Sequence, residues 1–213
     1  MLKVLVVDDH AIVRKGVVRI LEESPEIEAD CDEAANAQEA TRMAATGNYA
    51  MVLLDISLPG VNGLELLKNL RRDHPGLPIM ILSMHPEDQY AMRALTLGAV
   101  GYLTKESAPD ELVLAVHRVL AGGRYISASL AERLAAHLGS GMRTGTLPHE
   151  GLSDREFEIL RLIGAGRTPT QIANELFLSV KTVSTYRSRI LQKMHLNSSA
   201  ELMNYALRNN LPN

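Results

Sequence analysis

The sequence predicts an α/β domain followed by an all-α domain. Short apolar runs alternate with amphipathic stretches through residues 1–122, whereas only amphipathic stretches occur from residue 152 onward. Strands that are buried on both faces read as continuous apolar runs. Their alternation with helices is typical of a parallel sheet that is covered on both sides. The first domain is therefore expected to be a doubly wound sheet.

The strands are expected where the apolar runs occur. Those runs cover residues 4–7, 51–54, 79–82 and 99–103, with a weaker candidate at 27–34. Helices are expected near residues 12–22, 36–46, 63–72, 86–97 and 108–121. Five strand–helix units of this length favour the flavodoxin-like, five-stranded parallel arrangement with strand order 2-1-3-4-5.

The rest of the chain divides into a linker and a second domain. Residues 123–151 are expected to be a linker with a short helix near 127–138, because residues 139–151 are rich in glycine. The second domain, residues 152–213, is expected to hold helices near 153–165, 169–177, 180–194 and 198–208. Capping-box spacings begin at Ser153, Thr168 and Ser198. The short gap between the second and third helices is typical of a helix-turn-helix.

The composition favours a protein of the cytoplasm with no membrane contact. Hydrophobic residues make up 46% and charged residues 22% of the chain, as in ordinary globular proteins. No apolar run is long enough to span a bilayer, and the first residues do not resemble a signal peptide. The single cysteine, Cys31, has no partner for an internal disulfide, which fits a reducing compartment.

The charge is distributed unevenly along the chain. The formal charge is −5 over residues 1–149 and +2 over residues 150–213. Residues 176–200 hold four Lys or Arg and no acid. This asymmetry indicates two modules with different partners.

Charged and polar residues follow the apolar runs of the first domain. Asp8 and Asp9 follow the first run, Asp55 the third and Ser83 the fourth, and Lys105 lies beyond the fifth. In a parallel sheet these ends share one edge, where ligands bind. A lone aspartate there usually closes a turn. Three clustered carboxylates, however, need a cation, and oxygen ligands without His or Cys favour Mg²⁺. A carboxylate nucleophile beside that metal can accept a phosphoryl group.

This pattern resembles the receiver domain of two-component response regulators over the whole of residues 1–122. The resemblance is carried by Asp8-Asp9, the run from Asp55 through Pro59 to Gly63, Ser83, Tyr102 and Lys105. It implies that Asp55 is the phospho-acceptor and that a sensor histidine kinase phosphorylates it. It also implies that Asp9, Asp55 and the backbone carbonyl of Ser57 bind Mg²⁺, with Asp8 contributing through water.

The resemblance assigns roles to the remaining residues of this edge. Lys105 would pair with the phosphoryl group and Ser83 would move to hydrogen-bond it. Tyr102 would turn inward to fill the space that Ser83 leaves. Pro59 and Gly63 would shape the loop after the acceptor.

Two positions depart from the common receiver pattern. Met84 and then His85 follow Ser83, where many receivers have a small residue first. We expect Met84 to slow the loss of phosphate by obstructing water, unless it points into solvent. Glu106 follows Lys105 in place of the proline of some subfamilies, so a cis peptide there would lack the help of proline.

Residues 152–194 resemble the LuxR-type helix-turn-helix, which places the chain in the NarL/FixJ class of response regulators. Winding residues 180–194 as an α-helix gives an independent check. Val180, Val183, Ile190, Leu191 and Met194 fall on one side and form the expected core stripe. The opposite side is polar and basic, without acids, which suits a helix in the major groove of double-stranded DNA.

The expected DNA contacts follow from the family pattern. Ser184, Thr185 and Ser188 would read base edges, and Lys181, Thr182, Arg189 and Lys193 would contact phosphates. Arg187 projects into the apolar stripe, so we expect it to pack there and to pair with Glu156 of the first helix.

The last helix is the expected contact between two copies. Helix-turn-helix modules of this size usually bind paired half-sites as homodimers. The family pattern assigns the pairing to Leu202, Met203, Tyr205 and Ala206. The alternative for each of them is that it covers the core of its own module.

Together these features predict a phosphorylation-switched transcriptional regulator. It would not be an enzyme, apart from phosphoryl transfer to Asp55 and hydrolysis from it. Three alternatives remain: a DNA-binding protein whose receiver only dimerises, a phosphatase or phosphotransferase, and a protein-binding helix bundle in place of the DNA-binding module. Ser57 stands where the second alternative needs an acid. The salt dependence of binding separates the third.

Overall fold

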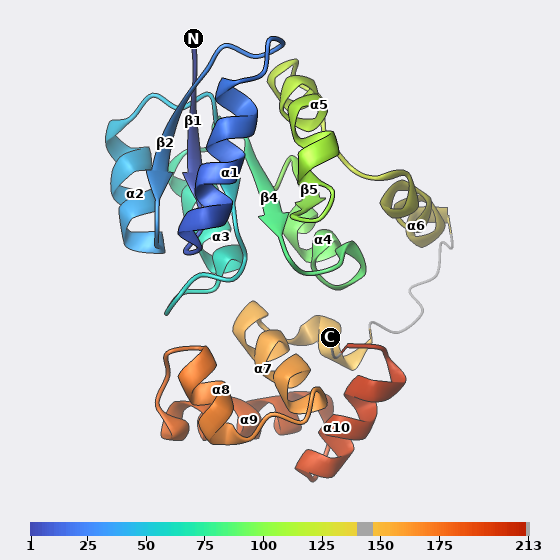
Figure 1. The fold of residues 1–213 in the computed structure, drawn as a ribbon. Helices are drawn as coiled ribbons and strands as arrows, with labels where there is room; N and C mark the ends of the chain where they lie inside the picture. The colour runs from blue at the N-terminus through green and yellow to red at the C-terminus, as the bar shows by residue number, and fades with distance from the viewer. Residues whose placement is uncertain (140–146, 212–213) are drawn as a thin grey trace. The chain divides into compact units, whose positions relative to one another are not determined.

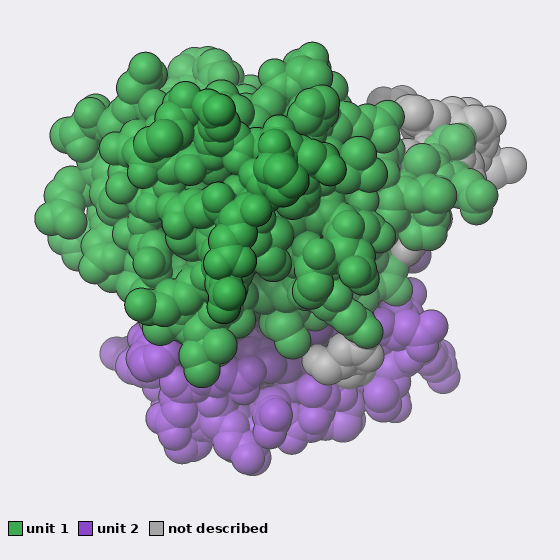
Figure 2. All heavy atoms as spheres, turned by 45° about the horizontal axis from the view of Figure 1, so that its top comes forward, with its two compact units in different colours: residues 1–140 green, residues 141–213 purple. Residues whose placement is uncertain are grey.

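The protein consists of two compact units (Figure 2), which span Met1–Ser140 and Gly141–Asn213. A computed structural model describes residues 1–139 and 147–211. The glycine-rich segment that we predicted to be flexible lies largely outside the described residues. Each unit is described by itself below.

The first unit is built on a five-stranded parallel sheet (Figure 1). Its strands are β1 (Leu2–Val7), β2 (Ala29–Ala34), β3 (Met51–Leu54), β4 (Ile79–Ser83) and β5 (Gly101–Thr104). The strand order is β2-β1-β3-β4-β5, as the sequence predicted. Because β1 and β3 are neighbours, the residues that follow these two strands meet at one edge of the sheet.

Helices cover both faces of this sheet (Figure 1). They are α1 (Ala11–Glu22), α2 (Ala37–Thr46), α3 (Gly63–Asp73), α4 (Glu87–Thr96) and α5 (Ala108–Leu120). On one face Val6 and Leu53 of the sheet pack in a single apolar cluster with Leu21 of α1 and Leu112 of α5. The helices α2, α3 and α4 lie on the other face. The doubly wound prediction is therefore confirmed.

The start of the predicted linker is part of the first unit. Tyr125 donates its N–H to the carbonyl of Val100 at 3.0 Å and accepts the N–H of Tyr102 at 3.2 Å, which adds a parallel bridge beside β5. The helix α6 (Ala128–Gly139) follows, and Ser127 caps it by accepting the N–H of Leu130 at 3.1 Å. The first residues of the predicted linker are therefore hydrogen-bonded to the sheet of the first unit.

The second unit is helical. It contains a 3-10 turn, η1 (Pro148–Gly151), and the helices α7 (Asp154–Gly164), α8 (Pro169–Glu175), α9 (Val180–Met194) and α10 (Ser199–Arg208). The capping boxes at Ser153 and Thr168 are confirmed. The third is incomplete: Ser198 caps α10, but the carboxylate of Glu201 accepts the N–H of Asn197 instead.

Two glycines of the first unit provide a matched test of packing. A Cβ at Gly63, the first residue of α3, would lie 2.2 Å from the carbonyl oxygen of Asp55, whereas a Cβ at Gly16 in α1 meets nothing within 4 Å. We expect Gly63→Ala to lower the free energy of unfolding by about 1–3 kcal/mol, because backbone would have to move. Gly16→Ala should raise it by about 0.5–1 kcal/mol. Urea unfolding followed by circular dichroism measures both, and equal effects would contradict the packing described here.

Candidate functional site

Three of the predicted pocket residues meet in a charged cluster at the carboxyl edge of the sheet. Asp8 follows β1 and Asp55 follows β3, and both are 2% exposed. The ammonium nitrogen of Lys105 lies 2.6 Å from Oδ2 of Asp8 and 2.7 Å from Oδ2 of Asp55. The lysine therefore places positive charge between the two carboxylates.

Asp9 and His10 complete the acidic cluster on its open side. Nδ1 of His10 lies 2.7 Å from Oδ1 of Asp9, and the backbone N–H of His10 donates to Oδ1 of Asp8 at 2.8 Å. One ligand atom from each of Asp8, Asp9, His10 and Asp55 lies within 4.8 Å of the others. The cluster was predicted to contain no His, and His10 corrects this prediction. Its place directly after Asp9 was the signal.

The two oxygens of Asp55 have different surroundings. Oδ2 accepts from Lys105, whereas Oδ1 is buried and has no hydrogen-bond partner. Burial raises the pKa of Asp55 above its ordinary value, although Lys105 opposes this effect. Burial also disfavours charge on Lys105, but Asp55 and Asp8 outweigh it and raise the pKa of the ammonium. Lys105 therefore stays charged, and one carboxylate oxygen of Asp55 is left for a ligand.

Ser83 and Tyr102 are joined through the backbone of His85. In the sequence this residue stood out only as a departure from the common receiver pattern. The side chains of Ser83 and Tyr102 are both fully buried. Oγ of Ser83 accepts the N–H of His85 at 3.2 Å, and the hydroxyl of Tyr102 donates to the carbonyl of His85 at 2.8 Å. Tyr102 is thus held at the buried end of β5 by the backbone of His85. Burial raises its pKa.

His85, not Met84, contacts the loop that follows Asp55. Nε2 of His85 lies 3.1 Å from Oγ of Ser57, two residues after the acceptor position. Met84 is 71% exposed, which agrees with the alternative that it points into solvent. No cis peptide occurs in the described parts of the chain, so the bond after Lys105 is trans.

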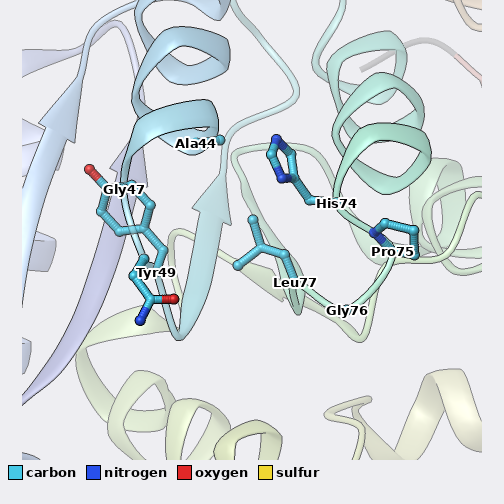
Figure 3. A pocket seen from close by; sticks show the side chains of 8 residues that line it. Ala44, Gly47, Tyr49, His74, Pro75, Gly76 and Leu77 are labelled. Atoms are coloured by element: carbon cyan, nitrogen blue, oxygen red, sulfur yellow. The ribbon is translucent and has the colours of Figure 1, made fainter.

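A separate cavity of about 310 Å³ lies at the opposite edge of the sheet. Tyr49, His74 and Leu77 surround it (Figure 3), just before the starts of β3 and β4. Its other lining residues are Ala44, Gly47, Asn48, Pro75 and Gly76. No carboxylate or ammonium lines it, so it offers nothing to the chemistry at Asp55.

The helix α9 presents most of the predicted DNA-contact residues on its outer face. Lys181, Thr185, Ser188 and Arg189 are exposed, and Thr182 and Ser184 are half-buried. Ser179 caps the helix by accepting the N–H of Thr182 at 3.0 Å. Val183, Ile190 and Met194 form the predicted core stripe. Val180 does not belong to it, because this side chain is 44% exposed.

The charged residues inside the second unit pair differently from the prediction. Lys193, not Arg187, bonds to Glu156, with 2.7 Å between Nζ and Oε2. Lys193 was expected at a DNA phosphate, but this ion pair uses it within the unit. Arg187 is half-buried as predicted, but its Nη1 lies 3.4 Å from Oγ of Ser199 and its Nε is buried without a partner. The periodicity of α9 correctly placed Arg187 on the inner face of the helix. It could not identify the residue of the neighbouring segment that Arg187 contacts, which is Ser199.

The predicted dimer residues of α10 divide into two groups. Leu202 and Ala206 are fully buried, which agrees with the alternative that they cover the core of their own unit. Tyr205 is half-buried, and its hydroxyl lies 2.7 Å from Nδ1 of His149. Met203 is exposed, as is Leu207 one turn later. Only the exposed pair remains available to a second copy.

Both halves of the chain match known families. The response regulator receiver domain matches residues 4–117, and the luxR family of bacterial regulatory proteins matches residues 150–206. Response regulator UvrY of Escherichia coli strain K12 is 36% identical over 213 residues, which cover 100% of this chain and 97% of UvrY. The chain is a response regulator of the LuxR type. It is therefore a DNA-binding transcription regulator controlled through its receiver domain.

Other response regulators extend this comparison. Response regulator GacA of Pseudomonas aeruginosa is 36% identical over 215 residues, which cover 99% of this chain and 98% of GacA. The structure of RcsB from Salmonella enterica serovar Typhimurium, bound to the promoter rprA with the phosphomimetic BeF3−, has a TM-score of 0.63. It is 27% identical and covers 96% of this chain and 98% of that one. None of the described helices is long and apolar enough to cross a membrane.

The buried charge of Asp55 leads to a prediction for this response regulator. A group whose pKa is raised by folding weakens the folded state as pH rises above its ordinary value, here 3.8. We expect Asp55→Asn to raise the free energy of unfolding at pH 7 by about 1 kcal/mol. The gain should shrink as pH falls toward 3.8. Urea unfolding across this range measures it, with exposed Asp110→Asn as control. A loss of stability at pH 7 would contradict the argument.

The ion pair between Lys193 and Glu156 leads to the reverse pH dependence: here stability is lost as pH falls, whereas the charge of Asp55 weakens the folded state as pH rises. Burial disfavours charge on Glu156, but Lys193 and Ser153 outweigh it and lower the pKa below 4.5. The pair thus stabilises the second unit above pH 4.5, and this contribution is lost as pH falls through the lowered pKa. Lys193→Met should cost about 0.5–1 kcal/mol at pH 7, because the lysine is partly exposed, and nothing in strong acid. Lys181→Met, at an exposed site, is the control; an equal loss there would refute the assignment.

Proposed function

We propose that Asp55 accepts a phosphoryl group from a sensor histidine kinase and that this phosphorylation changes how the chain binds DNA. The observation that carries the proposal is the unpartnered, buried Oδ1 of Asp55 beside the Lys105 ammonium. This oxygen would attack phosphorus while the bond from phosphorus to the kinase histidine nitrogen breaks, and the imidazole leaves with the electron pair. Lys105 can move from Oδ2 to the new phosphoryl oxygens, because its charge matches theirs.

The acidic cluster fits a hard divalent cation. Asp9 and Oδ2 of Asp55, which Lys105 would leave, offer carboxylate oxygens, which Mg²⁺ prefers. In our proposal Asp9, Asp55 and the backbone carbonyl of Ser57 hold Mg²⁺, with Asp8 contributing through water. When bound, Mg²⁺ supplies positive charge that offsets the charge of the phosphoryl oxygens. Hydrolysis at Asp55 would be the only other reaction of the chain.

The hydrogen bonds around Tyr102 support a path from Asp55 to the linker. Ser83, His85 and Tyr102 are linked by the bonds at 3.2 Å and 2.8 Å, and the N–H of Tyr102 donates to Tyr125. The carboxylate of Glu87, at the start of α4, accepts from the hydroxyls of Ser127 and Ser129. A shift of Ser83 toward a phosphoryl group would therefore act on His85 and Tyr102, and through Tyr102 on the bridge to Tyr125.

The second unit would bind double-stranded DNA with α9 in the major groove. Ser184, Thr185 and Ser188 would face base edges, and Lys181, Thr182 and Arg189 would face phosphates. We propose that two copies bind paired half-sites, since the RcsB structures include two dimers bound to two DNAs. Met203 and Leu207 offer the apolar contact between copies. The DNA that such a regulator controls lies in the cytoplasm, where we place the chain.

Phosphoryl uptake tests the acceptor directly. We expect the full chain, incubated with acetyl phosphate and Mg²⁺, to gain the mass of one phosphoryl group, and Asp55→Ala to gain none. Asp32→Ala is the matched control, because Asp32 pairs with Lys3 and Tyr49 away from the acidic cluster. Uptake by Asp55→Ala would refute the assignment.

Genome-wide DNA binding by wild type and Asp55→Ala then tests the switch. We expect the variant to occupy the same sites several-fold more weakly under the stimulus, because its receiver cannot be phosphorylated. Equal occupancy would mean that the receiver serves only as a dimerisation platform. Binding that is insensitive to salt would favour a protein partner over DNA.

A further inference from the structure

Two hydroxyl groups on the outer face of α9, those of Thr185 and Ser188, donate to backbone carbonyls of the same helix. Oγ1 of Thr185 donates to the carbonyl of Lys181 at 3.0 Å, and Oγ of Ser188 donates to the carbonyl of Ser184 at 3.1 Å. A hydroxyl carries one hydrogen and two lone pairs. In this arrangement both side chains present lone pairs to a base edge, and the threonine adds a methyl group.

An apolar side chain extends this face at the start of the helix. Val180 is the first residue of α9 and is 44% exposed, although the helical pattern assigned it to the core. It lies next to Lys181 and one turn before Ser184. The first turn of a recognition helix is the part that reaches base edges. An exposed valine here continues the proposed DNA interface.

Acceptors and methyl groups together select a particular base pair. In the major groove adenine offers its N6 amino group as a donor, and thymine offers its C5-methyl group. Cytosine also offers an amino group, at N4, but the G·C pair carries no methyl group. The A·T pair therefore offers partners to both kinds of group on α9, whereas the G·C pair offers a partner only to the acceptors.

We propose that Val180 is a specificity-determining residue of this regulator, which contacts a thymine methyl group. In the same half-site, Thr185 and Ser188 accept hydrogen bonds from adenine amino groups. The inference rests on the proposed role of α9 as the recognition helix, and it adds the chemical class of the bases that α9 reads.

Removal of single methyl groups from DNA tests the contact of Val180. A duplex is first enriched from a random-sequence library with the full chain, and each thymine is then replaced in turn by deoxyuridine. The wild type should bind about fourfold more weakly when one particular methyl group is absent, as expected for one buried methyl. Val180→Ala should bind the unmodified duplex more weakly and lose this sensitivity. Sensitivity that persists in Val180→Ala overturns the proposal.

Two matched variants separate Val180 from other exposed apolar residues. Phe177 is 70% exposed in the turn before α9, and Leu114 is 61% exposed on α5 of the first unit. Phe177→Ala and Leu114→Ala should keep the full response to deoxyuridine. Loss of the response in Phe177→Ala but not in Val180→Ala would assign the methyl contact to the turn and overturn the proposal.

A second base analogue tests the proposed hydrogen bonds from adenine amino groups to Thr185 and Ser188. Replacement of adenine by purine removes the N6 amino group, and it should weaken wild-type binding at one position of each half-site. Thr185→Val keeps the shape and the methyl groups but removes the acceptor, so it should abolish that sensitivity. A required guanine with no response to purine or deoxyuridine would overturn the proposal. Failure to enrich any sequence would instead refute DNA binding by α9, and the inference with it.

Discussion

The Lys105 ammonium lies between two buried carboxylates, and the first unit is organised around this contact. Asp8 and Asp55 follow adjacent parallel strands, so the topology of the sheet forces them together. Two carboxylates at this distance repel each other and would take up a proton without a cation. Lys105 comes from a third strand end and removes the conflict while leaving Oδ1 of Asp55 without a partner. The same contact that compensates the charge of two buried carboxylates therefore also leaves one oxygen of Asp55 available to a ligand.

The second unit shows how charges can serve the fold and the DNA interface separately. Glu156 is buried at the start of α7, where it completes a capping box and binds Lys193. Lys193 is thus paired within the unit, and Arg187 also contacts a residue of its own unit, Ser199. The residues left on the outer face are mostly hydroxyls with few cations. Such a face would derive its selectivity from the shape and donor pattern of the bases more than from charge.

The boundary between domain and linker differs from its appearance in the sequence. Gly122 and Gly123 end α5, and a helix end beside paired glycines normally marks the edge of a domain. Tyr125 nevertheless returns to the sheet and bonds both Val100 and the N–H of Tyr102. A backbone bridge of this kind depends on carbonyl and N–H groups, which every residue carries. No sequence pattern marks it.

The sequence by itself determined the order of the strands, the bounds of most helices and the meeting of Asp8, Asp55 and Lys105. These follow from hydrophobic periodicity and from the rule that parallel strands end at one edge, both of which are local or topological. Only the tertiary structure decided that His85 links Ser83 to Tyr102 and that Lys193 is the partner of Glu156. It also decided which residues of α9 and α10 are buried, since periodicity gives the face of a helix but not the extent to which a neighbour covers it. Those contacts join residues far apart in the chain or depend on packing at helix ends, where the periodic signal is weakest.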